Sequence, residues 1–362
     1  LFRSLSIDST VPTAVTALDL PFNEDRGSSS SDNITSKSSD IAISGATATD
    51  AKYVELYAEY DASGGTNFGA PVLLGKAYVV AGNGGFVFTT GSTPLADGKY
   101  RIRAKAFDAA GNESAFNATA ADLVITIDTS AGSAPTIGVA DADMSYIDGT
   151  VRFTRDPHYI TLSGTGPAGA NLMVFNDLNN NGIQDPGEPT MTLYAQNSVS
   201  AVSSPVINSG GTYTYDLVYL TDGVYNLRAV TTDAAGNSTT STSAIRFELD
   251  RSVSPNLAIA LAPIADYAGN DTGLSPYDHA TTDTTPTFRV TLPRNALAGD
   301  KVEITKYYLY GSTYVIAQRI LTSADITAGY VDMTSSALPA TSYAGADAIT
   351  AWYTDRAGNR ST

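Results

Sequence analysis

The chain has 362 residues, no cysteine, and 37 acidic against 21 basic residues, which gives a formal net charge of -16. This acidity argues against a nucleic-acid partner, which needs a basic stripe, and against an anionic membrane surface. No run of about 18 apolar residues predicts a membrane-spanning helix, and no disulfide can staple the fold, so a metal ion is the obvious staple for an extracellular protein of this kind.

Three internal repeats organise the chain. The segments FDAAGNES (Phe107–Ser114), TDAAGNST (Thr232–Thr239) and TDRAGNRS (Thr354–Ser361) recur at intervals of 125 and 122 residues. Before the first of them, LADGKYRIRAKA (Leu95–Ala106) alternates apolar and polar residues, which is typical of a half-buried strand. Units of about 120 residues with many short strands and regular turn signals favour a Greek-key sandwich of the immunoglobulin (Ig) type.

In chain order, the repeats predict a short strand followed by three domains. Residues 1–9 contain LFRSLSID, which matches the last strand of the first two units and therefore belongs to a preceding or neighbouring domain. Residues 10–129, 130–251 and 252–362 are then Ig-like domains 1, 2 and 3, the third lacking its last strand. The expected fold class is all-β, with three tandem Ig-like Greek-key β-sandwiches in an elongated rod.

The second unit allows its strands to be placed one by one. We expect strands near residues 136–140, 159–164, 171–176, 191–195, 212–218, 224–232 and 244–249. No stretch of the chain has a helical period of useful length. The third and fourth of these strands are joined by a long polar loop, at the end of the unit that faces the third domain.

This loop, NDLNNNGIQDPGE (Asn176–Glu188), has the ligand spacing of a calcium-binding loop of the EF-hand type. The predicted ligands at positions 1, 3, 5, 7, 9 and 12 are Asp177, Asn179, Asn181, the carbonyl of Ile183, Asp185 and Glu188. Gly182 stands at position 6, where a sharp turn is needed. The alternative is a polar, glycine-rich hairpin loop without metal. Because strands and not helices flank the loop, a bound Ca²⁺ is expected to be structural and not a switch.

The order of motifs resembles bacterial immunoglobulin-like repeats. It comprises DG-Y-x-aliphatic-x-A, then D-A-A-G-N, then an aliphatic strand that ends I-D before a proline, as in LVITIDTSAGSAP (Leu123–Pro135). The resemblance covers nearly the whole chain, although the antibody Cys–Trp–Cys core is absent. Such repeats build large surface adhesins and biofilm-associated proteins, some with calcium-stiffened stalks.

Further calcium sites are expected at the unit junctions, because the strand order of a sandwich brings certain loops to the same end, and the resemblance supports calcium there. Between the first two units the expected residues are Asp25, Asp32, Asp128, Asp233 and Asn237. Between the second and third they are Asp141, Asp143, Asp250, Asp355 and Asn359. Carboxylates crowded in this way repel one another without a cation. The alternative is that Asp and Asn cap turns by local hydrogen bonds.

The strand in residues 2–7 and the missing strand of the third unit have two explanations. A long repeat array cut out of register would produce both. Alternatively, residues 2–7 of one chain fill the open edge of the third unit of the next chain by donor-strand exchange, which yields a head-to-tail filament. A junction between chains would then join Asp8, Asp108, Asn112, Asp271 and Asp278 around calcium.

These patterns predict a non-enzymatic, extracellular or cell-surface structural or adhesive protein, a calcium-stiffened stalk or filament for cell-surface adhesion or biofilm. Its expected partners are adjacent repeats or copies of itself, and a cell-surface or matrix ligand. One alternative is a ligand-binding module in the third unit, where Tyr307, Tyr308, Tyr310 and Tyr314 form either cross-strand packing or an exposed aromatic patch. Another is an accessory region of a secreted hydrolase.

Overall fold

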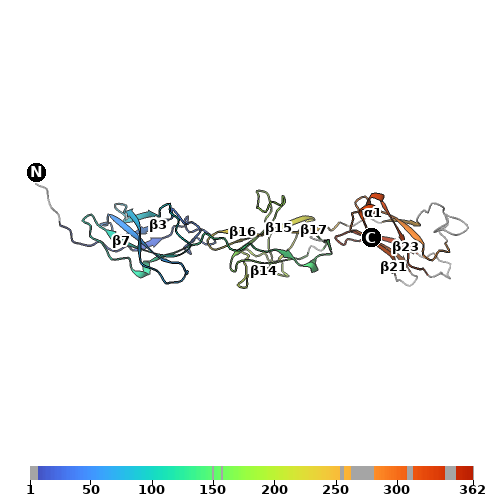
Figure 1. Cartoon of the computed structure of the whole chain (residues 1–362), viewed down its shortest axis with the longest axis horizontal. Helices are drawn as coiled ribbons and strands as arrows, with labels where there is room; N and C mark the ends of the chain where they lie inside the picture. Colours follow the sequence, from blue (N-terminus) through green and yellow to red (C-terminus); the bar gives the residue numbers. More distant parts are fainter. Residues whose placement is uncertain are drawn as a thin grey trace.

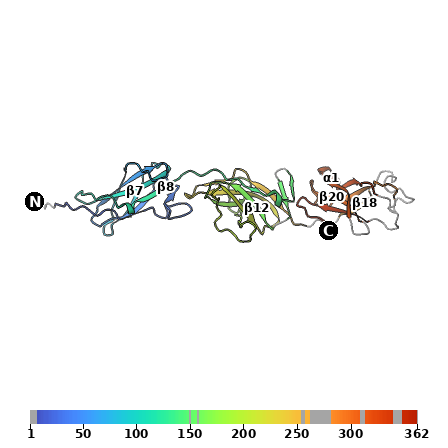
Figure 2. The ribbon, with the colours of Figure 1, turned by 90° about the horizontal axis from the view of Figure 1, so that it is seen from below.

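The computed structural model describes residues 7–148, 151–155, 158–252, 257–261, 281–307, 313–338 and 348–361. Its regular secondary structure is almost entirely β-strand, and the strands are arranged as three units that lie in a line (Figure 1, Figure 2). Each unit has a separate cluster of buried hydrophobic side chains. The predicted all-β fold is therefore confirmed.

The first unit is a sandwich of two sheets. One sheet has the order β1-β3-β6, with β1 at Ala17–Asp19, β3 at Ala42–Ala46 and β6 at Gly85–Thr89. The other has the order β2-β8-β7-β4-β5, with β2 at Ile34–Thr35, β8 at Leu123–Ile127, β7 at Gly98–Phe107, β4 at Tyr53–Asp61 and β5 at Val72–Tyr78. A single 3-10 turn, η1 at Thr119–Ala121, precedes β8.

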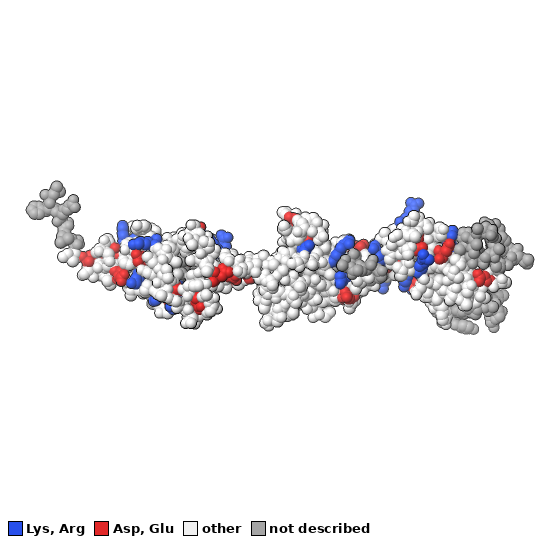
Figure 3. Space-filling view, in the orientation of Figure 1, with Lys and Arg blue, Asp and Glu red and all other residues white. Residues whose placement is uncertain are grey.

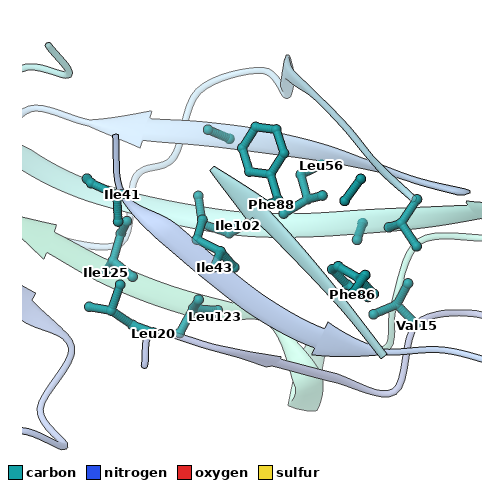
Figure 4. Close-up of a cluster of buried hydrophobic side chains, with 14 of the residues drawn as sticks. Val15, Leu20, Ile41, Ile43, Leu56, Phe86, Phe88, Ile102, Leu123 and Ile125 are labelled. Atoms are coloured by element: carbon teal, nitrogen blue, oxygen red, sulfur yellow. The ribbon is translucent and has the colours of Figure 1, made fainter. Parts of the chain in front are cut away.

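The core of the first unit lies between its two sheets, because every second side chain of each strand faces inward. Figure 4 shows Ile43 of β3 and Phe86 of β6 opposite Leu56 of β4 and Ile102 of β7. On β7 the residues expected to face inward are buried: Tyr100, Ile102, Ala104 and Ala106. The alternation seen in the sequence therefore sets the register of the central strand.

The second unit repeats this arrangement around its own core. One sheet has the order β14-β12-β9, with β9 at Gly138–Val139, β12 at Ile160–Thr165 and β14 at Thr212–Leu217. The other has the order β10-β11-β17-β15-β13. Its strands are β10 at Tyr146–Asp148, β11 at Val151–Thr154, β17 at Ile245–Leu249, β15 at Gly223–Thr232 and β13 at Asn171–Asn176. A further short strand, β16 at Ser238–Thr240, pairs with β15. A 3-10 turn, η2 at Asp141–Asp143, precedes β10.

The third unit has two three-stranded sheets among its described residues. The first has the order β18-β19-β22, with β18 at Ala258–Leu261, β19 at Thr287–Thr291 and β22 at Tyr330–Thr334. The second has the order β21-β20-β23, with β20 at Lys301–Tyr307, β21 at Thr313–Ile320 and β23 at Ala348–Thr354. A helical turn, α1 at Ser323–Ala328, begins with a capping box on Thr322 and Asp325 and ends at Gly329.

Three details differ from the sequence-based expectation. The strand expected near residues 191–195 is reduced to isolated bridges, such as the one between Tyr194 and Asp216. The helix α1 was not expected. Two strand pairs are parallel, β2 with β8 and β11 with β17, and their short strands have too few residues for a sequence period to reveal them.

Candidate metal centres

The loop Asp177–Glu188 begins where β13 ends, beside the neighbouring strand β15. The amide of Asp177 donates to the carbonyl of Asn226 on β15 at 2.8 Å, so the first loop residue is still held by the sheet. Its carboxylate is fully buried and accepts the backbone N–H groups of Asn181 at 3.1 Å and Gly182 at 2.9 Å. Gly182 has φ of 83°, which favours glycine at this turn. The loop therefore wraps around its first predicted ligand.

The other predicted ligands close the loop from its far side. Glu188 accepts the amides of Leu178 at 2.8 Å and Asp185 at 3.0 Å, one on each carboxylate oxygen. Asn179 and Asn181 both donate their side-chain NH₂ groups to Oδ2 of Asp185, each at 2.7 Å. The loop thus brings Asp185 together with both asparagines. Glu188, the last loop residue, is hydrogen-bonded to Leu178 near the start of the loop.

A buried arginine joins this loop to β15. Nε of Arg228 donates to Oδ2 of Asp177 at 2.6 Å, and Arg228 is only 9% exposed. Burial raises the pKa of the Asp177 carboxyl, but the hydrogen bonds from Arg228, Gly182 and Asn181 outweigh it and hold the pKa below its usual range. The sequence did not single out Arg228; only the antiparallel register of β13 and β15 brings it to the loop.

The donor set of this loop fits calcium. All the predicted ligand atoms are oxygens, which a hard cation of calcium's size prefers. A half-turn of the Asn179 or Asn181 amide exchanges its NH₂ for its oxygen. Two amide oxygens would then face the carboxylate of Asp185, an arrangement that repels unless a cation lies between them. The departure from the pattern is Arg228, which already neutralises Asp177.

The D-x-x-G-N loops form the same contact in all three units. In the second unit, Nδ2 of Asn237 donates to Oδ2 of Asp233 and to the carbonyl of Asp128, both at 2.9 Å. The equivalent donor atoms are those of Asn112, which bonds Asp108 and the carbonyl of Asp8, and of Asn359, which bonds Asp355 and the carbonyl of Asp250. Each loop is therefore hydrogen-bonded to the main chain that leads into its unit.

At the first junction, the loop between β1 and β2 of the first unit packs on the D-x-x-G-N loop of the second. The amide of Ser28 donates to the carbonyl of Ala234 at 3.2 Å. Gly27 lies so close that a Cβ on it would meet this carbonyl oxygen at 1.9 Å. In the same segment Asp25 is buried and accepts the amides of Asn33 and Ile34, and burial together with the nearby Asp32 raises its pKa.

At the second junction, two arginines cross between the units. Nη1 of Arg155 donates to the carbonyl of Gly358 at 2.7 Å. The guanidinium of Arg356 lies 4.3 Å from the ring centre of Phe153, and its Nε is 3.8 Å from Oδ1 of Asp300. Figure 3 shows blue and red atoms side by side near this junction, whereas red atoms prevail where the first unit ends.

A cavity of about 80 Å³ lies at the second junction, beside the carboxylates of Asp250, Asp300 and Asp355. Burial raises the pKa of Asp355, the hydrogen bonds from Asn359 oppose this, and the charges of Asp250 and Asp300 add to the rise. Like charges are therefore concentrated here. Asp300 was not singled out in the sequence, since it lies outside the repeated motifs.

The remaining predicted ligands have other partners. Asp141 is 70% exposed at its side chain and pairs with Arg152, while Asp143 accepts the amide of Thr161. Asp271 and Asp278 lie outside the described residues. Within the described part of the chain, no three acidic or histidine side chains come close enough together to form a metal-binding group. The structure thus brings together parts of each predicted junction site.

The fold and the junction loops define a modular all-β protein with repeated sandwich units. Residues 10–129, which form the first unit, match the family model of the bacterial Ig-like domain. The resemblance inferred from the repeats is confirmed there. No curated protein sequence matches the chain.

One solved structure, Escherichia coli alpha-2-macroglobulin activated by porcine elastase, is similar over 97% of this chain and 35% of its own length, with 10% identity and a TM-score of 0.20. This chain thus spans about a third of that protein. No helix among the described residues is both long and apolar enough to cross a membrane.

Proposed function

We propose that this protein is a non-enzymatic structural module of an extracellular, surface-attached stalk that is stiffened by calcium and serves adhesion or biofilm formation. Bacterial Ig-like domains are typical of surface and extracellular proteins, which supports this location. The observation that carries the proposal is a repeated hydrogen bond. In each unit, an asparagine side chain donates to a main-chain carbonyl of the segment that leads into that unit, and the three donors are Asn112, Asn237 and Asn359. Because the same contact recurs at all three units, it would hold each unit in a fixed position on the main chain that leads into it.

Calcium would add stiffness at two kinds of place. In the loop of the second unit, Asp177, Asp185, Glu188 and the two asparagine amides would hold one ion. At the junctions, the pairs Asp25–Asp32 and Asp250–Asp355 would face a cation that relieves their repulsion. An ion that binds only the folded, docked state stabilises it by roughly 2.7 kcal/mol at a hundredfold excess over Kd.

Small-angle scattering and calorimetric melting of the whole chain, with calcium and with a chelator, test this proposal. We expect a longer maximum dimension and a higher Tm in calcium. The variant Glu188→Gln weakens binding in the loop, whereas Glu113→Gln changes an exposed glutamate of the first unit and serves as the control. Identical scattering and melting of the natural chain in calcium and chelator would overturn the proposal.

We further propose that copies assemble head to tail by donor-strand exchange. In the first two units, β7 and β15 are each paired on both edges, by β4 and β8 and by β13 and β17. In the third unit, the equivalent strand β23 pairs with β20 alone among the described residues. Residues 2–7 have the pattern of β8 and β17, and Ile7 is 86% exposed, so this segment is suited to complete the sheet of another copy.

Electron microscopy of the natural chain tests for such filaments, with a synthetic peptide of residues 1–9 as competitor. We expect filaments that shorten as the peptide occupies β23. Monomeric rods at every concentration, with and without calcium, would contradict the assembly.

A ligand-binding role of the third unit is the second candidate. Tyr307 on β20 is 48% exposed and Tyr314 on β21 is 58% exposed, so two aromatic rings are accessible on this sheet. Each accessible tyrosine ring offers a large apolar face and a polar hydroxyl to a ligand. A glycan array probed with the natural chain and with Tyr314→Ala would separate this role from a purely structural one.

A further inference from the structure

The carboxylate of Asp216, on strand β14 of the second unit (Figure 1), is buried but only half hydrogen-bonded. Asp216 is 0% exposed. Its Oδ2 accepts the backbone amide of Asn197 at 2.6 Å, whereas its Oδ1 has no hydrogen-bond partner among the described residues. In contrast, the other buried aspartates of the described chain accept hydrogen bonds at both carboxylate oxygens: Asp25, Asp61, Asp108, Asp177, Asp300 and Asp325.

The strand directs Asp216 to the outer face of its sheet. Tyr215 and Leu217, on either side of Asp216, pack in the core between the two sheets, so the intervening side chain points the other way. The backbone of Asp216 exchanges two hydrogen bonds with Tyr194, at 2.9 and 3.0 Å. Its partner on the opposite edge, Thr161 of β12, therefore forms a non-hydrogen-bonded pair with it, in which the two side chains are close together.

A short hairpin covers this outer face. Tyr194 is bridged to Asp216 on one side and to Ala201 on the other, so residues 193–202 extend the sheet β14-β12-β9 at its edge. The hairpin turns between its two bridged residues, and the amide of Asn197 at its tip reaches back to the Asp216 carboxylate. The hairpin tip thus helps to remove this carboxylate from solvent.

The first unit shows that the fold does not require an acid here. Phe86 on β6 and Tyr213 on β14 are equivalent, because each lies directly opposite a glycine of the neighbouring strand and packs against it. Three residues further along, the second unit has Asp216 and the first has Thr89. Thr89 is exposed, and β6 is the last strand of its sheet among the described residues. The second unit thus has both an added hairpin and an added carboxylate beneath it.

The buried carboxylate lacks a positive charge beside it. Moving an ionised carboxylate out of water is unfavourable unless hydrogen bonds or a counter-charge replace the water. The amide of Asn197 serves one oxygen only, and no cationic side chain of the described residues forms an ion pair with Asp216. A single cation next to Oδ1 would supply both the missing contact and the missing charge. The Thr161 hydroxyl, on the same face, offers a neutral oxygen of the kind that hard cations bind.

We propose that one monovalent cation, Na⁺ or K⁺, binds between the sheet and this hairpin, with Oδ1 of Asp216 as its charged ligand and the Thr161 hydroxyl as a neutral one. Charge decides the class of ion. One carboxylate balances one monovalent cation, whereas Ca²⁺ would leave an excess positive charge in a buried place, and calcium sites gain affinity from several charged ligands. The site is independent of the loop Asp177–Glu188, which follows β13 on the other sheet of the unit.

Hydrogen exchange of the full chain in a calcium chelator tests the site, with mass spectrometry of the peptide that contains residues 193–202. The salt is NaCl, KCl or tetramethylammonium chloride at one ionic strength; the tetramethylammonium ion has the same charge but is too large to coordinate a buried oxygen. Because the hairpin tip is bonded to the same carboxylate, a bound ion holds the hairpin closed. We expect its amides to exchange about tenfold more slowly in NaCl or KCl when the ion is at ten times its Kd.

Two matched variants assign the effect to the carboxylate. Asp216→Asn keeps the shape of the side chain and removes its charge, so the exchange of this peptide should no longer depend on the salt. Asp222→Asn makes the same change at an exposed aspartate of the same unit, which pairs with Arg251, and should keep the salt dependence. Crystals of the natural chain grown in rubidium chloride need no variant, and should show an anomalous-scattering peak beside Oδ1 of Asp216.

Three results would count against the proposal. Equal exchange of the peptide from the natural chain in all three salts would overturn it. A salt dependence that remains unchanged in Asp216→Asn would place the ion elsewhere and overturn it as well. Protection of the hairpin by Ca²⁺ but by neither Na⁺ nor K⁺ would refute the monovalent class of the ion.

Discussion

Asn237 and Asp128, which belong to different units, are joined by a hydrogen bond of 2.9 Å from the asparagine side chain to the aspartate carbonyl. The same amide group also bonds Asp233 within its own loop. One side chain thus fixes both the shape of the loop and the path of the linker. The bond goes to main chain, so it does not depend on which side chains the preceding unit presents.

The substitution Gly27→Ala should loosen the first junction. Gly27 has φ of 133°, and its Cβ would overlap the carbonyl oxygen of Ala234. The two units must then move apart, which lengthens or bends the rod in small-angle scattering. Gly64→Ala is the control: it has φ of 69° with nothing within 4 Å, so it adds only backbone strain of about 1–2 kcal/mol. Equal scattering profiles for the two variants would contradict the close approach at Gly27.

Arg228→Met should make the second unit dependent on calcium. The change leaves the buried carboxylate of Asp177 without its cation, and breaking a buried pair in this way costs about 3–5 kcal/mol. Calcium in the loop would supply the missing charge, so we expect the Tm to fall in chelator and to recover largely in calcium. Arg246→Met on β17 alters an exposed arginine and should have little effect. A Tm loss that is the same with and without calcium would count against metal binding at Asp177.

Arg356→Ala should loosen the second junction alone. Arg356 contacts Phe153 of the second unit and Asp300 of the third, and a cation–π contact contributes about 0.5–2 kcal/mol. Arg360→Ala is a matched control from the same loop, because Arg360 lies over Trp352 and near Glu303 within the third unit. Spin labels on the second and third units should show a broader distance distribution only for Arg356→Ala. The inference about this junction fails if both variants broaden it equally.

Two aspartates at equivalent loop positions should respond to pH with opposite signs. The pKa of Asp355 is raised from 3.8, chiefly by burial. The free energy of unfolding therefore decreases as pH rises from 3.8 through the raised pKa, because the buried carboxyl must then carry its charge. The pKa of Asp108 is lowered, chiefly by Asn112, so its contribution is present above 3.8 and is lost as pH falls through the lowered value.

At pH 7 in chelator, Asp355→Asn should therefore raise the free energy of unfolding and Asp108→Asn should reduce it. Both effects should shrink under acid conditions, where the natural side chains are protonated. Chemical denaturation at several pH values measures this, and a stabilising Asp108→Asn would contradict the assignment.

Much of this architecture was predictable because it repeats. The alternation in Leu95–Ala106 predicted the buried face of β7, and the D-x-x-G-N motifs predicted which loops meet the linkers. The arginines at the junctions were not predictable, since Arg155 and Arg356 have no equivalents in the first unit. Arg228 was not predictable for another reason. The sequence pattern places it on the solvent-exposed face of its strand, and only the pairing of β15 with β13 brings it to Asp177.

The parallel pairing of the last strand with an early strand has a mechanical consequence. Tension along the rod pulls β11 toward the start of the second unit and β17 toward its end. Four residue pairs, Val151 to Thr154 against Arg246 to Leu249, then resist shear together and cannot be peeled apart one by one. The first unit has two such pairs, between β2 and β8, so under load it should yield before the second.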